Sequence, residues 1–430
     1  MLLLLFALAQ LICLSETCWH WNYARSEVAR PTARLLIFDA GSTGTRLFFY
    51  QISKPTSDAS ASSMKVEQHN IKKTVALSSI TNAAAFPELR SRLRVTLDRM
   101  KSRKDILEER FYKNTEVHLY ATAGLRLVST ALSSKILEIV KSVFRASDFL
   151  FKSDESVRIL SGQEEGVYLW LAVNFALNKS ETVAVMDLGG GSTQIALSIN
   201  QTGTAKQENE YNRKLLNYDT SLYAVSYLNA GRSAVRKLLS DKNEQGIYES
   251  VCVLPNKTLT ETFSGQELQY TGTEMAEDKF EECRVRAKDV VSQLKIEKIF
   301  SVTNPLPTMY AVSSFYYTSK LLTNLQESYC DIKKCMASQL SGSGGFFTLK
   351  WAKNVSSIIC NSPDPPKMVS LANQDFVCMD FSWLIALLQD GYGIYDENHP
   401  IHLQLAHSGI NFDWATGIAL QRAHEIFNNH

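Results

Sequence analysis

One short motif occurs twice in this chain, and the repeat restricts the folds that the chain can adopt. The first copy, residues 36–46, reads Leu-Ile-Phe-Asp-Ala-Gly-Ser-Thr-Gly-Thr-Arg, and the second, residues 184–194, reads Ala-Val-Met-Asp-Leu-Gly-Gly-Gly-Ser-Thr-Gln. Each copy is an apolar strand followed by an aspartate and a turn of small residues. Asp39 and Asp187 are 148 residues apart, about the length of one domain. The repeat therefore predicts two phosphate-binding loops that grip one nucleotide from opposite sides.

The residue types of the two turns suit an anion. Glycine lacks Cβ, so the backbone can turn sharply and come close to a ligand, and successive N–H groups then point into one concavity. The predicted phosphate-binding residues are Gly41, Ser42, Thr43, Gly44, Arg46, Gly189, Gly190, Gly191 and Ser192. One copy alone is compatible with an ordinary turn, because aspartate and glycine are common there. Two matched copies favour a functional site.

The two aspartates imply a divalent cation. Asp39 and Asp187 would repel phosphate unless a metal ion lay between them and the ligand. Mg²⁺ usually keeps several waters and uses few carboxylates, which fits a site with only these two. Arg46 has two interpretations that stay open, a contact in the ligand site and a clamp on its own loop.

A glutamate after another predicted strand is the candidate general base. Glu165 lies between Gly162 and Gly166, where a turn would expose its carboxylate. A carboxylate near phosphate oxygens and a metal can deprotonate a water for in-line attack. Glu164 competes for this role, since adjacent side chains point in opposite directions and only one of them faces a cleft. The alternative is a solvated helix N-terminus, where the dipole favours glutamate.

Further candidates surround this glutamate. Thr122 follows a strand and precedes a turn of small residues, so it can hold the attacking water or a phosphate. Gln194 occupies in the second motif the place that Arg46 has in the first, and can hold the same water. The segment 313–317 carries aromatic side chains, which usually belong to a core, and the alternative is that one of its tyrosines stacks on a nucleobase.

Length and pattern predict an α/β protein. For a chain of 430 residues, two or three domains are expected from the length alone. Strands alternate with helical patterns, which indicates parallel or mixed sheets, and helices are expected over 218–239, 282–295 and 414–427. The 45 basic and 44 acidic residues give a net charge of +1, without a long basic run. A nucleic-acid partner is therefore not expected.

The N-terminus indicates the secretory route. Residues 1–14 are nearly all apolar and too few to span a bilayer comfortably. They fit a signal peptide over residues 1–17, and a short retained anchor is the alternative. No other stretch is apolar enough to span, so we expect no stable membrane span after leader cleavage. Four glycosylation sequons begin at Asn178, Asn200, Asn256 and Asn354.

The cysteines support the same route. Six of the eight lie after residue 250, and an even set in an oxidising compartment suggests disulfides. We favour the pairs 252–283, 330–335 and 360–378, although fifteen pairings are possible. These bonds would brace the second domain and take no part in the chemistry.

Five blocks of the chain resemble, in order, the E-type apyrases, the nucleoside triphosphate diphosphohydrolase family. The blocks are Asp39–Arg46, Ala121–Arg126, Gly162–Gly166, Asp187–Gln194 and Ala311–Tyr317. The segments 378–382, 388–393 and 413–417 are also similar, so the resemblance covers about residues 34–427. The fourth block has Gly191 where the family usually has alanine.

This resemblance implies an α/β fold of two RNase H-like lobes of the actin/hsp70 superfamily, with the nucleotide in the cleft between them. Lobe I would span residues 34–155, completed by the C-terminal helix within 400–430, and lobe II would span 156–399 with the disulfides. The implied activity is Ca²⁺- or Mg²⁺-dependent removal of terminal phosphates from nucleoside di- and/or triphosphates, without a covalent intermediate. We expect a monomer, secreted or in the lumen of the endoplasmic reticulum or Golgi.

The resemblance also implies roles, residue by residue. The catalytic set is Glu165 as the base, with Thr122, Ser192 and Gln194 positioning the water. The other assignments are Asp39 and Asp187 for a metal held through waters, Trp414 near the metal, and Tyr316 for the nucleobase.

Other functions compete with hydrolysis. The same nucleotide clamp serves actin-like switches or chaperones, kinases, and polyphosphate hydrolases. A leader, cysteines and a candidate base favour the secreted hydrolase. The tail resembles luminal diphosphatases, whereas the third block and the cysteine pair near residue 330 resemble the cell-surface triphosphate branch, so the sequence leaves substrate preference open.

Overall fold

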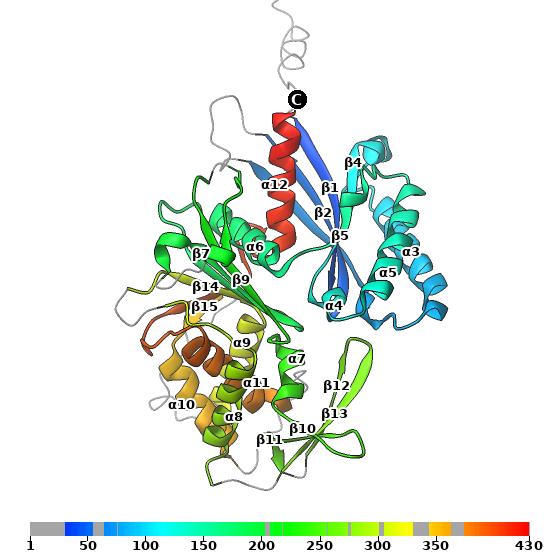
Figure 1. Ribbon diagram of the computed structural model, residues 1–430. Helices are drawn as coiled ribbons and strands as arrows, with labels where there is room; N and C mark the ends of the chain where they lie inside the picture. Colours follow the sequence, from blue (N-terminus) through cyan, green and yellow to red (C-terminus); the bar gives the residue numbers. More distant parts are fainter. Residues whose placement is uncertain are drawn as a thin grey trace, which may run out of the picture.

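Two mixed sheets, with two helices between them, form the body of the protein (Figure 1). The computed structural model describes residues 31–54, 64–74, 76–202, 207–216, 218–255, 257–273, 277–300, 305–329, 344–362 and 374–429. The predicted leader and the predicted bond between residues 330 and 335 lie outside these residues.

The first sheet has five strands in the order β3-β2-β1-β4-β5. These are β1 (Thr32–Gly41), β2 (Gly44–Ser53), β3 (Lys65–Thr74), β4 (Thr115–Ala121) and β5 (Val157–Ile159). β1 runs antiparallel to β2 and parallel to β4. Helices α3 (Phe86–Ser102) and α5 (Thr130–Arg145) cover one face, where Phe38 of β1 packs on Phe144 of α5. The short helix α4 (Ala123–Arg126) follows β4.

The second sheet has seven strands in the order β15-β16-β14-β6-β7-β9-β8. These are β6 (Ala184–Leu188), β7 (Ser192–Ser198), β8 (Glu210–Tyr211), β9 (Leu222–Leu228), β14 (Met309–Ser313), β15 (Gly344–Phe347) and β16 (Ile401–Gln404). One hydrophobic core is formed by residues of this sheet together with residues of four helices, α8 (Lys279–Gln293), α9 (Ser314–Tyr329), α10 (Leu349–Cys360) and α11 (Val377–Ala386). A π-helical turn, Leu387–Gly391, continues α11.

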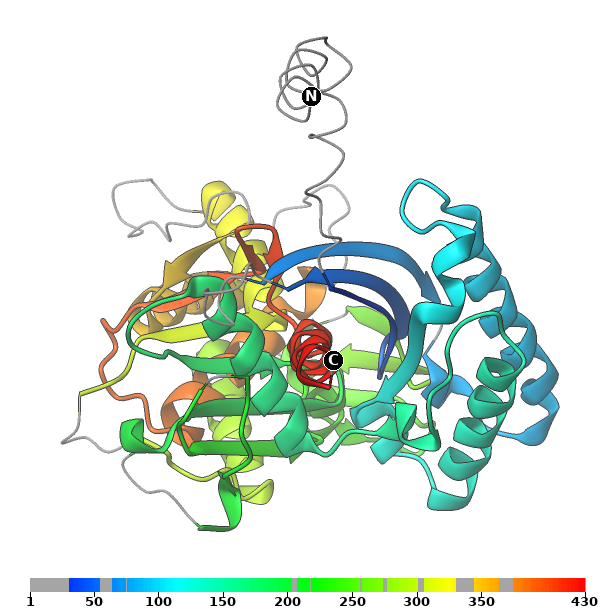
Figure 2. The ribbon, with the colours of Figure 1, turned by 90° about the horizontal axis from the view of Figure 1, so that it is seen from above.

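Helices α6 (Gly162–Leu177) and α12 (Trp414–Asn428) lie between the two sheets (Figure 2). Their apolar residues join one buried cluster with inward-facing residues of both sheets, among them Ile37 and Val185. The helices touch at Gly417, where a Cβ would lie 1.8 Å from the carbonyl oxygen of Tyr168. Glycine is therefore required at this crossing, because any side chain would separate the two helices.

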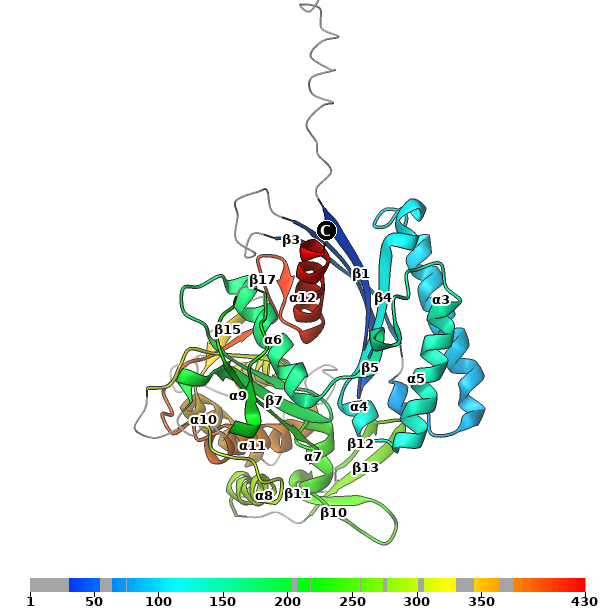
Figure 3. The ribbon, with the colours of Figure 1, turned by 45° about the horizontal axis from the view of Figure 1, so that its top comes forward.

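A small four-stranded sheet extends from the half of the protein that contains the seven-stranded sheet, the second half, toward the half that contains the five-stranded sheet, the first half. Its order is β10-β11-β13-β12, with β10 (Asp241–Lys242), β11 (Tyr248–Pro255), β12 (Thr258–Phe263) and β13 (Gln266–Gly272). Helix α7 (Arg232–Leu238) precedes it. The β12–β13 turn, Ser264 and Gly265, has φ of 52° and 78°. This turn packs on Ser79 of the first half, within 2.7 Å of a Cβ built on Gly265, and the hairpin lies beside α4 (Figure 3).

Short elements complete the chain. The pair β17 (Ala406–His407) and β18 (Ile410–Asn411) precedes α12. Single 3-10 turns are Leu77–Ser79, Ala83–Ala85, Glu109–Asn114, Asp154–Ser156, Ile199–Gln201, Gln207–Asn209 and Gln374–Phe376. Among the described residues, no helix combines the length and the apolarity that crossing a bilayer requires.

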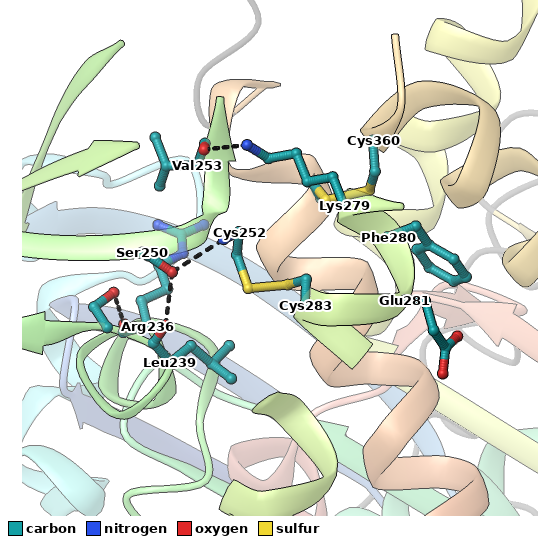
Figure 4. The surroundings of a disulfide bond; sticks show 12 residues. Arg236, Leu239, Ser250, Cys252, Val253, Lys279, Phe280, Glu281, Cys283 and Cys360 are labelled. Atoms are coloured by element: carbon teal, nitrogen blue, oxygen red, sulfur yellow. Dashed lines mark hydrogen bonds between the residues drawn. A yellow bond between two sulfur atoms is a disulfide. The ribbon is translucent and has the colours of Figure 1, made fainter. Parts of the chain in front are cut away.

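Both predicted disulfides within the described residues are present. Cys252 of β11 is bonded to Cys283 of α8, which ties the small sheet to the helical layer (Figure 4). Cys360 of α10 is bonded to Cys378 of α11. Three of the four sequon asparagines, Asn178, Asn200 and Asn354, lie in the described residues and are exposed.

The sheets place two strands differently from the predicted lobe boundaries. β5 follows the predicted boundary at residue 155, but it pairs in parallel with β4 of the first sheet. β16 lies in the predicted C-terminal part of lobe I, but it pairs with β14 of the second sheet. The predicted helix 218–239 is also wrong, since 222–228 is strand β9 and only 232–238 is helical. Leucine, tyrosine and valine in 222–228 favour a strand, and this strand pairs with β7 on one side and β8 on the other.

A buried ion pair fastens α12 to the first sheet. Glu116 of β4 is 5% exposed and accepts bonds from Arg422 of α12 at 2.8 and 2.9 Å. His118 contacts the same carboxylate at 3.0 Å. Burial alone would raise the pKa of Glu116, but the bonds from Arg422 and His118 outweigh burial and lower the pKa to about 2. The ion pair between Glu116 and Arg422 therefore helps to hold α12 against the first sheet.

We predict that Glu116→Gln lowers the free energy of unfolding by about 3 kcal/mol at neutral pH, because Arg422 keeps its charge without this partner. The wild-type contribution is present above the ordinary pKa of 4.5 and is lost as the pH falls toward about 2. Urea unfolding of both proteins from pH 7 down to pH 3 measures this. The control is Glu425→Gln, which removes the exposed partner of Arg422. A Glu116→Gln protein as stable as wild type at neutral pH would contradict the assignment.

Candidate active site

The repeated motif folds as two equivalent β-hairpins. In the first, Asp39 of β1 faces Arg46 of β2, and in the second, Asp187 of β6 faces Gln194 of β7. Both aspartates therefore occupy the same register position beside a turn of small residues. The parallel neighbours β4 and β14 end beside these turns, so side chains from four strand ends meet in one place.

A cavity of about 560 Å³ lies where the hairpins meet. All but three of the predicted site residues line it. Those that do are Asp39, Gly41, Ser42, Thr43, Arg46, Thr122, Glu165, Asp187, Gly189, Gly190, Gly191, Ser192 and Trp414. The structure thus brings the predicted catalytic, phosphate-binding and metal residues together, and their roles stay predictions.

The two loops touch each other. A Cβ on Gly190 would lie 2.7 Å from Ser42 Oγ and from Thr43 Cγ2, and a Cβ on Gly191 would lie 3.0 Å from Ala123 Cβ. The first loop and α4 therefore pack directly on the second loop. Gly190 gives the two loops this close approach, and Gly191 lies against α4.

The start of α7 holds the second loop, a feature that the sequence reading missed. The N–H groups of Arg232 and Ser233 donate to the carbonyl oxygens of Gly189 and Gly190 at 2.9 and 3.0 Å. Asn229 donates to Gly191 at 2.9 Å. Because C=O and N–H of a trans peptide point in opposite directions, turning the carbonyls toward α7 aims loop N–H groups at the cavity.

Asp39 and Arg46 form an ion pair at 2.9 Å across the first hairpin. This contact supports the interpretation of Arg46 as a clamp, although its side chain also lines the cavity. Burial raises the pKa of Asp39 to about 6, against the attraction of Arg46. The carboxylate is thus poorly hydrated, and Arg46 offsets part of the cost of its burial.

The cavity fits a hydrated divalent cation. Asp187 Oδ1 is buried and has no hydrogen-bond partner among the described residues. Asp413, at the N-cap of α12, adds a third carboxylate to the cavity wall. Within the described chain no three acidic, histidine or cysteine side chains converge closely enough to chelate an ion directly. An ion held through waters meets both conditions, as Mg²⁺ commonly is.

Glu165, rather than Glu164, faces the cavity. Glu164 is the N3 residue of a capping box with Ser161, and Arg158 binds it at 2.9 and 3.0 Å. Glu165 is 6% exposed, and its Oε2 accepts from Arg126 at 2.5 Å and from Gln194 at 3.1 Å. Burial is the main cause that raises the pKa of Glu165 to about 8. A carboxyl with this pKa is suited to exchange a proton near neutral pH.

Two of the predicted water-positioning residues reach the cavity and one does not. Thr122 and Ser192 line it, and Thr122 is anchored by its N–H, which donates to Ala40 at 3.2 Å. Gln194 lies behind the cavity wall, where its amide donates to Ser192 Oγ at 2.7 Å and to Glu165. Gln194 therefore contacts Ser192 and Glu165, which would hold the water, and does not reach the cavity itself. Gly44, paired with Gly41 across the hairpin, also lies outside the lining.

The prediction that Tyr316 stacks on a base conflicts with the geometry. Tyr316 is 4% exposed and belongs to the core beneath the second sheet. Tyr317 is 58% exposed and lines the cavity. The helix α9 begins at Ser314, and one residue further along a helix turns the side chain by about 100°. Of this adjacent pair, Tyr317 is the side chain that reaches the cavity and Tyr316 is not.

The structure adds charged residues that the sequence reading did not assign to the site. Arg232, the first residue of α7, lines the cavity, and Arg126 reaches Glu165 from behind it. Asp413 was visible only as part of a similar segment. Arg126 had a signal, since it ends the second similar block, whereas Arg232 lies in no block.

Comparison with known proteins places the chain among nucleoside phosphatases. The model of the GDA1/CD39 (nucleoside phosphatase) family matches residues 33–430. Nucleoside diphosphate phosphatase ENTPD5 of Homo sapiens is 27% identical over 94% of this chain and 90% of its own length. Ectonucleoside triphosphate diphosphohydrolase 5 of Bos taurus is 30% identical over the same shares. Probable apyrase 3 of Arabidopsis thaliana is 26% identical over 89% of this chain and 80% of its own.

Solved structures share the fold. A nucleoside triphosphate hydrolase of Neospora caninum matches with a TM-score of 0.66 and 16% identity, covering 96% of this chain and 98% of its own. A Ppx/GppA protein of Aquifex aeolicus matches with a TM-score of 0.51 and 16% identity, covering 93% of this chain and 100% of its own. These matches confirm the predicted α/β fold class, here built around two mixed sheets.

We predict that Gly231→Ala displaces the second loop. A Cβ at this position would lie 2.3 Å from Ser192 N and 2.5 Å from Gly191 N, both backbone atoms that cannot rotate away. Overpacking of this kind costs about 1–3 kcal/mol, so the affinity for a non-hydrolysable nucleotide should fall by about tenfold or more. Isothermal titration calorimetry measures the change.

The control for this variant is Gly344→Ala in β15, where a Cβ would lie 3.5 Å from its nearest neighbours, an ordinary contact. That substitution should leave the affinity unchanged. Equal affinities for Gly231→Ala and wild type would show that the loop does not depend on the start of α7.

Proposed function

The chain belongs to the GDA1/CD39 family of nucleoside phosphatases and is a nucleotide phosphohydrolase, and we propose that it removes terminal phosphates from nucleoside di- and triphosphates with Glu165 as the general base. The observation that carries the proposal is the position of Glu165. It is a buried carboxylate that faces the cavity between the two touching loops, and it lies outside the two strands that carry Asp39 and Asp187. A protein that only bound nucleotides would have no need of a proton acceptor there.

The reaction uses groups that the cavity presents. N–H groups and hydroxyls of the two loops bind the oxygens of the terminal phosphate, which places its phosphorus between the loops. A water held by Thr122 and Ser192 attacks in line with the leaving oxygen. Glu165 takes one proton from this water as the bond to phosphorus forms, and the bond to the leaving nucleotide breaks. Inorganic phosphate and the shortened nucleotide are the products.

Asp39 and Asp187 would hold the divalent cation through waters, with Asp413 adding negative charge beside them. When bound, the cation neutralises the charge of the phosphate chain and of the three carboxylates. Ca²⁺ and Mg²⁺ are the proposed ions, because hard oxygen ligands and retained waters suit both.

We also propose that the protein acts in the secretory pathway, in the lumen or after secretion. Two disulfides and three exposed sequon asparagines within the described residues are consistent with an oxidising, glycosylating compartment. Relatives with this fold are named as diphosphatases, apyrases and triphosphatases, so the proposed substrates include both di- and triphosphates.

A substrate panel tests the proposed function. Phosphate release from ATP, ADP, UTP, UDP, GTP and GDP is measured with Ca²⁺, with Mg²⁺ and with a chelator. We expect release that the chelator abolishes, and that Glu165→Gln lowers by a factor of about 10²–10⁴. The matched control is Glu164→Gln, next to the base but paired with Arg158 outside the cavity. Folded protein that releases no phosphate from any nucleotide would overturn the proposal.

We predict that Tyr317 stacks on the nucleobase. Stacking of one base on an aromatic side chain contributes about 1–3 kcal/mol, so Tyr317→Ala should raise KM by about tenfold while Tyr317→Phe preserves it. Steady-state kinetics with the preferred nucleotide measure both. Tripolyphosphate, which has no base, is the control substrate, and the control variant is Tyr395→Ala, at an exposed tyrosine outside the cavity lining. An equal loss with tripolyphosphate would assign Tyr317 to the phosphate chain or to the fold.

A further inference from the structure

We propose that Arg126 is a positioning residue that orients Glu165 through one carboxylate oxygen and leaves the other for the attacking water. The inference rests on the proposed function, because it names what aims the proposed base. Arg126 Nη2 lies 2.5 Å from Glu165 Oε2. Arg126 itself does not line the cavity, so it acts on the reaction through Glu165.

The guanidinium connects three parts of the site. Arg126 is the last residue of α4, which follows the first sheet, and Glu165 lies in the first turn of α6. The same Nη2 approaches Ser192 Oγ, at the end of the second loop, at 3.3 Å. One side chain from the first half thus fixes the base and a loop hydroxyl of the second half in one arrangement.

Space for this guanidinium is built into the helix. A Cβ on Gly162, the first residue of α6, would lie 2.5 Å from Arg126 Nη1 and 2.2 Å from Ser226 Cβ. The glycine therefore opens the passage through which Arg126 reaches Glu165. Arg126 Nε is buried and has no hydrogen-bond partner among the described residues. A side chain that only stabilised the fold would be expected to satisfy this donor.

The hydrogen bonds to Glu165 are one-sided. Oε2 accepts from Arg126 and from Gln194 of β7, at 2.5 and 3.1 Å. Within the described residues no hydrogen bond is made to Oε1. Two donors on one oxygen fix the plane of the carboxylate, and they direct the remaining oxygen at the proton of a bound water.

The charged groups around Glu165 also support a positioning role for Arg126. The charged groups that act on Glu165 are Arg126 from α4, Asp39 from β1 and Asp187 from β6. Burial is the largest cause that raises the pKa of Glu165, both aspartates raise it further, and the charge and hydrogen bond of Arg126 lower it. Removing Arg126 would leave Glu165 protonated over a wider pH range, in which it cannot accept a proton from water.

A second role for this arginine, direct binding of a substrate phosphate, makes a different prediction. A phosphate ligand contributes to substrate affinity, so its loss raises KM and leaves the pH dependence of kcat unchanged. A positioning residue for the base contributes to kcat and to the pH profile. The two roles are therefore distinguished by kinetics across pH.

The experiment compares Arg126→Gln, Arg126→Lys and Arg158→Gln with wild type. Arg158 is the matched control, since it pairs with the neighbouring Glu164 at 2.9 Å on the side away from the cavity. For Arg126→Gln we expect kcat at pH 7 to fall at least about tenfold with KM within about threefold, and the acidic limb of kcat/KM to move up by about one pH unit. Arg126→Lys should restore much of both, and Arg158→Gln should change neither.

An increase in KM with an unmoved pH profile, or a Lys variant no better than the Gln variant, would overturn the proposal. An infrared titration gives a readout that needs no turnover. The carbonyl band of protonated Glu165 is identified as the band absent from Glu165→Gln, and its midpoint should rise in Arg126→Gln. If wild type released no phosphate, the proposed function would fail, while this midpoint would still test the pairing. If the midpoint did not move, the proposed effect of Arg126 on Glu165 would be wrong, and the proposed function would be unaffected.

Discussion

The rest of this structure depends on one constraint, which is that several carboxylates lie close together in a buried cavity. Asp39, Glu165 and Asp187 are each less than 9% exposed and share one cavity with Asp413. Carboxylates in such a place repel one another and lose hydration, which raises their pKa values. The arrangement is sustainable only with cations beside it, and Arg46 and Arg126 each neutralise one carboxylate. The charge that remains explains why a divalent ion suits the site.

The fold delivers these carboxylates by repetition. Two hairpins present an aspartate at the same register position, and two helices between the sheets carry Glu165 and Asp413 to the same point. Close contacts at glycines set the spacing, between the loops at Gly190 and between the helices at Gly417. The chemistry therefore depends on backbone positions as much as on side chains, and small residues determine how near the two halves come.

The sequence predicted what is local and repeated, and it missed what depends on helix phase and on strand partners. The loops, Glu165 and two disulfides could be predicted because residue type and spacing express them directly. The choice between Tyr316 and Tyr317 required the start of α9, which adjacent tyrosines do not reveal. The membership of β5 and β16 required knowledge of strand pairing across long stretches of chain. Arg126 lies in a similar block, but its contact with Glu165 depends on the packing of α4 against α6, and the start of α7 acts on backbone and lies in no block.

The small sheet connects a disulfide bond to the neighbourhood of the second loop. Cys252 anchors β11 to α8, β11 pairs with β13, and the β12–β13 turn rests on Ser79 of the opposite half. Phe263 of this hairpin lies 3.9 Å from a Cβ built on Gly190. The disulfide thus anchors the sheet whose β12–β13 hairpin lies near the second loop. Reduction of this bond would free β11 from α8, so the position of the hairpin beside the second loop depends in part on a covalent bond far from the cavity.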